Sequence, residues 1–329
     1  MRALAALLVA VLALGGCGGG DDPAPPQGEP GEPTSLTPAT DNPFAGRAPY
    51  VDPDSRAARA AAEAQAQGDT DAVRVFERLA ETPAGIWLTP EQYPPGEVGG
   101  VVARLSADAA AQGEVPVFVV YGIPDRDCTG GFSSGGLPAD QYGPWVQEIA
   151  DAATGAVVVV EPDALASALE CERREERVRL IGDAVSVLVD AGVSTYVDGG
   201  HSHWIEPGAL AALMQQVGVE QARGFATNVS NYQTDDDERA YAEQLSGLLG
   251  GAHYVIDSGR NGRGSTDEWC NPTDRAFGRE PEAVDDGTAL DAFLWVKPPG
   301  ESDGECQGGP AAGEFWPERA LEMGAASGW

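Results

Sequence analysis

Basic side chains are scarce in this sequence. It has 20 lysine and arginine residues against 52 aspartate and glutamate residues, a formal net charge of −32. A surface of that sign repels the phosphates of nucleic acids and of anionic membranes. We therefore expect no nucleic-acid partner, and the charge suits a protein that acts on a neutral or cationic molecule.

Lysine is reduced to a single residue, Lys297, since the other basic residues are all arginine. An ammonium and a guanidinium are not interchangeable where the geometry of a contact matters. The position that keeps the only lysine is therefore a candidate for a specific chemical task.

Histidine is also rare, and the three that occur argue against metal chemistry. His201 and His203 form a His-x-His pair, but such a pair needs further histidine ligands from later strands. Only His253 remains, and it comes before the end of its expected strand. We expect no metal, and no cofactor is indicated because no glycine-rich phosphate loop of the usual spacing is present.

A serine nucleophile is not expected, on similar grounds. Residues 200–204 begin like the Gly-x-Ser-x-Gly elbow of serine hydrolases, but Trp204 stands where the second glycine is needed. The tight turn of that motif then has no support.

The apolar run at the N-terminus, Ala3 to Leu14, is too short to span a bilayer comfortably and has the length of a signal-peptide core. Residues 14–17 (Leu-Gly-Gly-Cys) resemble the bacterial lipobox, in which the cysteine is acylated. We expect residues 1–17 to be a lipoprotein signal ending at Cys17, with membrane contact only through this anchor at the cell surface. The alternative is an ordinary secretory signal and a secreted protein.

Cysteine number agrees with export. Of the five cysteines, removing Cys17 leaves four, Cys128, Cys171, Cys270 and Cys306, and disulfides persist in exported proteins. Three pairings are possible, and sequential pairing is the simplest. Each bridge would then close a loop of a few tens of residues and contribute about 3–4 kcal/mol.

One domain is expected after a linker. Residues 18–45 are rich in proline, glycine and acidic residues and predict a disordered tether. From residue 46 to residue 329 no comparable break and no internal repeat occurs, which predicts a single domain.

Short apolar runs alternate with helical patterns through this domain. Alternation predicts a parallel α/β sheet, and runs this continuous predict strands buried on both faces. Seven runs favour a closed or nearly closed (β/α) barrel, a distorted TIM-like barrel of about seven strands. The runs are 86–88, 115–120, 157–160, 195–197, 224–227, 254–256 and 293–296.

Polar residues follow six consecutive runs, and the carboxyl ends of parallel strands share one face of a barrel, where its active site lies. The ordinary solvent exposure of loops would explain polar residues after one or two runs, but not after six. We therefore expect a cleft there, lined by residues that include Tyr121, Asp127, Glu161, Asp163, Asp198, His201, Asn228, Asn231, Asp257, Arg260, Lys297, Glu301 and Asp303.

Four of these residues, Asp127, Asp163, Asp198 and Asp303, supply carboxylates from four loops. Any one alone is most simply a helix cap or an ion-pair partner. Together they are typical of glycosidases, in which one carboxyl stays protonated and another ionised.

Aromatic rings near the strand ends favour a carbohydrate ligand, because sugar rings stack on flat apolar faces. Trp87, Trp204 and Trp269 are candidates for such stacking. Trp295 lies inside an apolar run and is expected in the core instead.

Several longer motifs resemble those of glycoside hydrolase family 6, in the same order along residues 42–329. They are Tyr-Gly-Ile-Pro-Asp-Arg-Asp-Cys (121–128) with Ser-Ser-Gly-Gly (133–136), Val-Val-Val-Val-Glu-Pro-Asp (157–163), Tyr-Val-Asp-Gly-Gly-His (196–201), Asn-Val-Ser-Asn-Tyr (228–232), Trp-Cys-Asn-Pro (269–272) and residues 294–304. The resemblance implies a distorted barrel and inverting hydrolysis of β-1,4-glucosidic bonds without a cofactor.

The resemblance also implies catalytic roles. Asp163 matches the proton donor, and Asp127 the group that raises its pKa and helps to organise the water. Asp303 matches the proposed base, acting directly or through a water chain. Ser133 would help to place the water, and Tyr121 would crowd the sugar at the cleavage point.

The remaining matches imply substrate binding and disulfides. Lys297 and Glu301 would hydrogen-bond sugar hydroxyls on the non-reducing side, with Trp87 and Trp269 stacking there and Trp204 on the leaving-group side. Asp198, His201 and Asn231 would line the cleft. The family's disulfide pattern corresponds to Cys128–Cys171 and Cys270–Cys306.

Three differences from the family's exo-acting members bear on whether the glucan chain is cut at its end or internally. Exo-acting members often carry a second tryptophan where Pro207 stands, and a glycine is usual at His203. The interval 269–293 is too short for the loop that roofs their tunnel. An endo-β-1,4-glucanase is therefore expected. The alternatives are a cellobiohydrolase on the same fold and an inactive surface glucan-binding lipoprotein.

Overall fold

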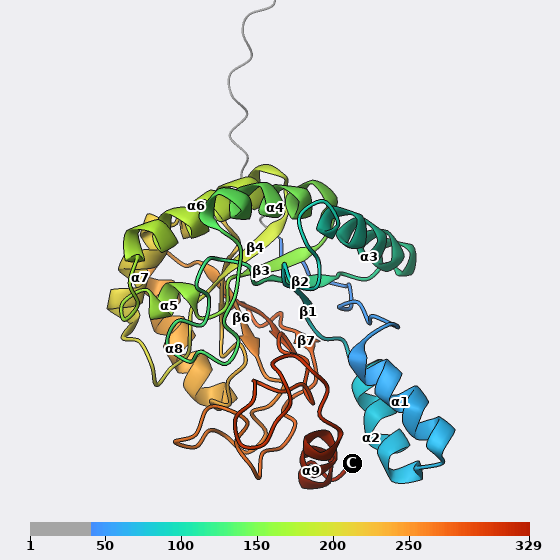
Figure 1. The fold of residues 1–329 in the computed structure, drawn as a ribbon. Helices are drawn as coiled ribbons and strands as arrows, with labels where there is room; N and C mark the ends of the chain where they lie inside the picture. Colours follow the sequence, from blue (N-terminus) through green and yellow to red (C-terminus); the bar gives the residue numbers. More distant parts are fainter. Residues whose placement is uncertain (1–40) are drawn as a thin grey trace, which may run out of the picture. The chain divides into compact units, whose positions relative to one another are not determined.

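The computed structural model describes residues 41–329. The expected signal segment, Cys17 and nearly all of the expected tether lie outside these residues. Within them, the chain folds as an α/β unit in which a curled sheet is surrounded by helices (Figure 1).

The sheet has eight strands in the order β1-β2-β3-β4-β5-β6-β8-β7. All neighbours pair in parallel except β7, which is antiparallel to β8. The expected seven parallel strands are thus confirmed, as is the distorted barrel. Their bounds are β1 Ile86–Leu88, β2 Val117–Val120, β3 Val157–Val160, β4 Ser194–Asp198, β5 Gly224–Thr227, β6 His253–Asp257, β7 Glu282–Ala283 and β8 Leu290–Leu294.

Valine-rich strands form this sheet because both of its faces are covered. In β3, all four valines are buried. Val157 and Val159 pack with Tyr196 and Val255 in one cluster, whereas Val158 and Val160 pack in a second cluster with helical residues. This is the alternation of a strand between two apolar layers.

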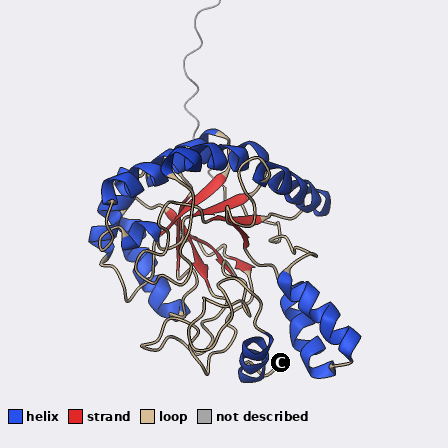
Figure 2. Cartoon of the chain, in the orientation of Figure 1, coloured by secondary structure: helices blue, strands red, loops and turns tan. Residues whose placement is uncertain are grey.

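Helices cover the outer layer, as Figure 2 shows in blue around the red strands. They are α1 Arg56–Gln67, α2 Thr70–Glu81, α3 Val98–Gln112, α4 Ala139–Ala152, α5 Ala164–Ser167, α6 Arg174–Asp190, α7 Pro207–Gln216, α8 Asp235–Leu248 and α9 Pro317–Ala326, with a 3₁₀ turn at Val219–Gln221. Among residues 41–329, none of these helices is long and apolar enough to cross a membrane.

One expected strand is displaced from its predicted position. The apolar run 293–296 predicts a strand there, but β8 spans Leu290–Leu294 and pairs with β6 through a register shift between Tyr254 and Val255. Trp295 instead turns into a side cluster with Phe277, as its expected core role requires, and is 1% exposed.

The first and last parallel strands, β1 and β8, do not pair with each other. Instead, isolated hydrogen bonds join their ends, and we call this contact the seam. The amide of Gly85, just before β1, donates to the carbonyl of Trp295, just after β8, at 2.8 Å. The indole Nε1 of Trp87 donates to the carbonyl of Val296 at 2.9 Å. A Cβ at Gly85 would lie 2.2 Å from that same carbonyl oxygen, so the approach requires glycine.

A helical hairpin, α1 and α2, precedes β1. Ser55 and Asp69 cap the two helices by accepting from Ala58 N and Ala72 N. The hairpin packs on α9 near the C-terminus.

Ordered packing begins slightly earlier than the expected domain boundary at residue 46. Phe44 is 1% exposed and belongs to the inner apolar cluster. Asn42 donates through Nδ2 to the carbonyls of Val284 and Asp291. Residues 42–45 therefore belong to the folded unit.

Candidate active site

Asp163 occupies the turn between β3 and α5 in the left-handed conformation, with φ 65°. Its backbone amide donates to Oδ1 of Asp198 at 2.9 Å, and the same oxygen accepts from Gly200 N at 3.0 Å. Asp198 thus fixes a backbone conformation that a non-glycine residue rarely adopts.

The pKa of the Asp163 carboxyl is raised. Burial, followed by repulsion from Asp127 and Asp303, raises its pKa from 3.8 to about 7. A carboxyl with this pKa is protonated through the acid and near-neutral range.

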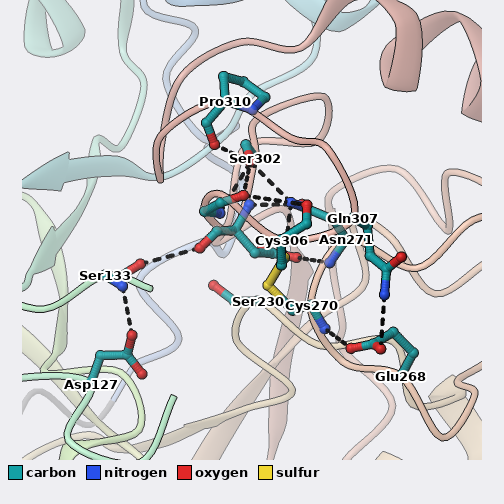
Figure 3. Close-up of a disulfide and its surroundings, with 12 residues drawn as sticks. Asp127, Ser133, Ser230, Glu268, Cys270, Asn271, Ser302, Cys306, Gln307 and Pro310 are labelled. Carbon is teal, nitrogen blue, oxygen red and sulfur yellow. Dashed lines mark hydrogen bonds between the residues drawn. A yellow bond between two sulfur atoms is a disulfide. The ribbon is translucent and has the colours of Figure 1, made fainter. Parts of the chain in front are cut away.

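Asp127 lies on the loop after β2, also with positive φ. Its Oδ1 accepts from Gly130 N at 3.1 Å and its Oδ2 from Ser133 N at 2.6 Å. The hydroxyl of Ser133 donates to the main-chain carbonyl of Asp303 at 3.4 Å. Figure 3 shows Ser133 between the Asp127 carboxylate and the segment that carries Cys306.

Asp303 is a buried carboxylate held on both oxygens. Oδ1 pairs with Arg260 Nη1 at 2.8 Å, and Oδ2 accepts from Asn271 N at 3.0 Å and from the Tyr232 hydroxyl at 3.3 Å. These three contacts fix the orientation of the Asp303 side chain.

Lys297 is 6% exposed, and its ammonium lies 3.3 Å from the carbonyl of Ser302 and 3.9 Å from Glu301. It also sits over the ring of Trp87 at 5.2 Å. Burial lowers its pKa. The single lysine of the sequence therefore lies at the cleft.

A groove of about 490 Å³ runs along this side of the site. Trp87 and Tyr121 meet edge to face at 5.0 Å on its wall. Burial and the nearby Asp163 and Asp127 raise the pKa of Tyr121 well above its ordinary value, so its hydroxyl stays protonated.

The opposite side of the site is built around Trp204. Its Nε1 donates to Glu170 at 3.1 Å, and its ring lies 5.6 Å from that of His201. Burial and His203 lower the pKa of His201 to about 4, so the imidazole is neutral.

Trp269 is 46% exposed and lies against Phe132, with ring centroids 5.8 Å apart. A Cβ at Gly130 would come within 2.9 Å of the Trp269 ring. Trp269 thus covers the loop that carries Asp127 and Ser133.

Both disulfides form in the pairing that the resemblance implies. Cys128 bonds to Cys171 and Cys270 to Cys306. The first follows Asp127 directly. The second (Figure 3) begins next to Asn271, whose amide donates to Asp303.

One expectation about Asp198 differs from the structure. It was expected to line the cleft, but its side chain is fully buried beneath Asp163. Asn231 is half-buried, and its amide donates to Asn228 O at 2.9 Å.

Two carboxylates support the site without having been assigned a role from the sequence. Glu161 is fully buried, and its Oε1 accepts from Gly122 N and Ile123 N at 2.9 and 3.1 Å. Asp257 accepts from Ser230 N, Gly259 N and Lys297 N. Each directly follows an apolar run in the sequence, which was the available signal. Only the packing shows that both side chains bind backbone amides.

His253 lies at the other end of the barrel. It starts β6 and contacts Asp291 at 3.1 Å, beside the Arg223–Asp291 ion pair. It is thus remote in the fold from His201 and His203. Among residues 41–329, no group of three or more histidine, cysteine or acidic side chains is arranged to hold a metal ion.

Comparison with known proteins agrees with this geometry. The model of the family described as "Glycosyl hydrolases family 6" matches residues 44–326. The chain belongs to this family. Family 6 membership accounts for the distorted barrel.

Among family 6 proteins, the chain is 45% identical over 281 residues to endoglucanase A of Cellulomonas fimi, covering 85% of this chain and 61% of that protein. It therefore spans less than two thirds of that relative. A more distant relative is the probable 1,4-beta-D-glucan cellobiohydrolase C of Aspergillus niger, 30% identical over 327 residues, with 83% of this chain and 71% of that one covered.

A solved structure is similar throughout the domain. It is the endoglucanase Cel6 from Mycobacterium tuberculosis in complex with methyl-cellobiosyl-4-deoxy-4-thio-β-D-cellobioside. The TM-score is 0.81 at 42% identity, with 88% of this chain and 100% of that chain covered.

Proposed function

We propose that this protein is an inverting endo-β-1,4-glucanase in which Asp163 is the general acid. The observation that carries the proposal is the Asp163 carboxyl, whose pKa of about 7 keeps it protonated between two other carboxyl groups. The glucan-like ligand of the similar Cel6 structure supports a β-1,4-glucan as substrate.

In the proposed reaction, Asp163 gives its proton to the glycosidic oxygen as the bond to the anomeric carbon breaks. A water molecule attacks that carbon from the opposite face, and the configuration inverts. Asp127 and the Ser133 hydroxyl organise this water. Asp303, which pairs with Arg260, accepts the water's proton directly or through a water chain.

Substrate binding follows the two sides of the site. On the non-reducing side, a sugar ring stacks on Trp87, and Trp269 stacks nearby. The hydroxyls of that sugar accept a hydrogen bond from Lys297 and donate one to Glu301. On the leaving-group side a ring stacks on Trp204, which Glu170 orients. Tyr121 crowds the sugar at the point of cleavage and favours its distortion.

Endo action is favoured by the leaving-group side. Pro207, where exo-acting members often carry a second tryptophan, is the first residue of α7. Residues 269–293 contain β7 and the start of β8, and this interval is too short for the loop that roofs the tunnel of exo-acting members. An open cleft admits the middle of a glucan chain.

The proposed setting is the cell surface. Signal-like residues 1–17 and the spacing before Cys17 support export and lipid anchoring, with residues 18–41 as the tether. Metabolic labelling with a tritiated or alkyne fatty acid tests this, because a Cys17→Ser variant should carry no label and appear in the medium.

The decisive experiment is proton NMR of cellohexaose during the first minutes of digestion. Initial appearance of the α-anomer at new reducing ends is the expected result. The β-anomer would mean retention and overturn the roles given to Asp163 and Asp303. Absence of cleavage, with binding intact, would favour a surface glucan-binding protein.

A further inference from the structure

The groove beside the site continues beyond the residues that family resemblance assigns. It runs from Tyr121 and Ser133 past Trp87 and Lys297, and it ends on α1 and on the segment after β1. Arg56, Gln92 and Tyr93 line this far end. Neither the resemblance nor the proposed mechanism uses them.

These side chains form a connected polar belt. Arg56 Nε lies 3.8 Å from Glu301 Oε1, and its Nη2 donates to Gln92 Oε1 at 3.3 Å. Gln92 Nε2 donates to the Tyr93 hydroxyl at 2.8 Å. The belt therefore starts at a proposed sugar-binding residue, Glu301, and leads away from the catalytic carboxyls.

Fixed elements hold this belt in place. Arg56 begins α1, which Ser55 caps. The Tyr93 carbonyl accepts from the fully buried Trp145 Nε1 at 2.8 Å, and the Gln92 and Tyr93 amides both donate to Thr89 O. Arg56 lines the groove and keeps 37% of its side chain exposed.

The chemistry of the belt fits a neutral sugar. A guanidinium, an amide and a phenol offer the mixed donors and acceptors that sugar hydroxyls need. The charge of Arg56 is balanced by Glu301, and that of the neighbouring Arg59 is directed to the Asp54 carbonyl. The site thus lacks the excess positive charge that an anionic ligand would require.

We infer that Arg56, Gln92 and Tyr93 form an additional glucosyl-binding site, one sugar beyond the site at Trp87 on the non-reducing side. This inference rests on the proposed function. It also explains endo action, because an enzyme that releases a terminal disaccharide has no sugar to place there. When a glucan chain binds by its middle, the third glucosyl residue before the scissile bond fills this site.

The test is the cleavage pattern of cellopentaose carrying ¹⁸O at its reducing end, read by mass spectrometry. Occupying the new site places three sugars before the scissile bond, so labelled cellobiose forms. Leaving it empty gives labelled cellotriose. The wild-type protein should give mainly labelled cellobiose.

Gln92→Ala and Arg56→Ala should each lower the ratio of labelled cellobiose to labelled cellotriose by about three- to tenfold, the effect of one or two lost hydrogen bonds. Gln92 does not contact Glu301 or Lys297, so its variant isolates the new site. Arg74→Ala on α2, where Arg74 pairs with Asp71 of the same helix, is the matched control and should leave the ratio unchanged.

An unchanged ratio in both groove variants overturns the inference while leaving the glucanase function intact. A shift in Arg56→Ala alone would be an effect through Glu301 and would also overturn it, as would an equal shift in Arg74→Ala. No cleavage of cellopentaose by the wild-type protein would instead reject the proposed function.

Discussion

The backbone amide of Asp163 is held by the carboxylate of Asp198 at 2.9 Å. This bond keeps Asp163 in a left-handed conformation at the head of α5, where Asp127 and Asp303 both raise its pKa. One aspartate thus serves as scaffold and the other as the proposed acid.

Replacing the acid should remove turnover of ordinary substrates. Asp163→Asn keeps the size of the side chain but cannot give a proton, so kcat for cellohexaose should fall by about 10²–10⁴-fold. Cleavage of 2,4-dinitrophenyl cellobioside, whose leaving group needs no proton, should fall far less. Equal losses on both substrates would contradict the assignment.

Asp127 should set the alkaline limit of activity. The acid must be protonated, so kcat/KM should fall as pH rises through about 7, the pKa of Asp163. Asp127→Asn removes a negative neighbour that raises this pKa, so the alkaline limb should move to lower pH. A pH profile of kcat/KM on carboxymethyl cellulose measures it, and a limb that stays in place would show that Asp127 does not act on Asp163.

Glu161 should make the protein less stable as pH rises. Burial raises its pKa from 4.5 to about 7, so between these values the folded state holds a proton that the unfolded state has lost, and stability falls with rising pH. Glu161→Gln can still accept from Gly122 and Ile123 but has no charge to bury. The difference in free energy of unfolding between this variant and the wild type should grow in favour of the variant by about 3 kcal/mol from pH 4.5 to pH 8. Urea unfolding at both pH values measures this, and a pH-independent difference would contradict it.

Gly224 should tolerate no side chain. A Cβ there would lie 1.7 Å from the carbonyl oxygen of His253 on the neighbouring strand. Gly224→Ala must push β5 and β6 apart and should lower the free energy of unfolding by at least about 1–3 kcal/mol. Gly208→Ala is the control, since an added Cβ meets nothing within 4 Å in the first turn of α7, and it should be neutral or slightly stabilising.

The Cys128–Cys171 disulfide should affect both stability and binding. It closes a loop of 43 residues, so the Cys128→Ser, Cys171→Ser double variant should lose about 4 kcal/mol. Because Cys171 follows Glu170, the partner of Trp204, KM for long oligosaccharides should also rise. Calorimetry and steady-state kinetics measure the two effects, and an unchanged KM would show that Glu170 keeps its place without the disulfide.

The sequence predicts those parts of the molecule that depend on local pattern. Valine runs mark strands such as β3 because burial on both faces leaves no polar positions. Asp163 and Lys297 could be placed at one face because each directly follows, or nearly follows, such a run. The apolar run 293–296 predicted a strand in the wrong place because Trp295 and Val296 are buried outside the sheet. Apolar sequence alone does not distinguish a strand from a buried loop.

Relationships between distant segments could not be predicted. Asp198 and Glu161 look like cleft residues in the sequence, yet both bind backbone amides below the surface. Their depth depends on how neighbouring turns pack. The pairing of Arg260 with Asp303 joins residues 43 positions apart, and no local pattern indicates it.

The seam between β1 and β8 gives Trp87 two tasks at once. Its indole nitrogen fastens the barrel where the strand ladder is missing, while its ring faces the groove in which a glucan would lie. A bound polymer that stacks on Trp87 would therefore stabilise the contact between the two ends of the parallel sheet. The amide of Gly85, which bridges that contact, is where ligand-dependent slowing of hydrogen exchange should be greatest.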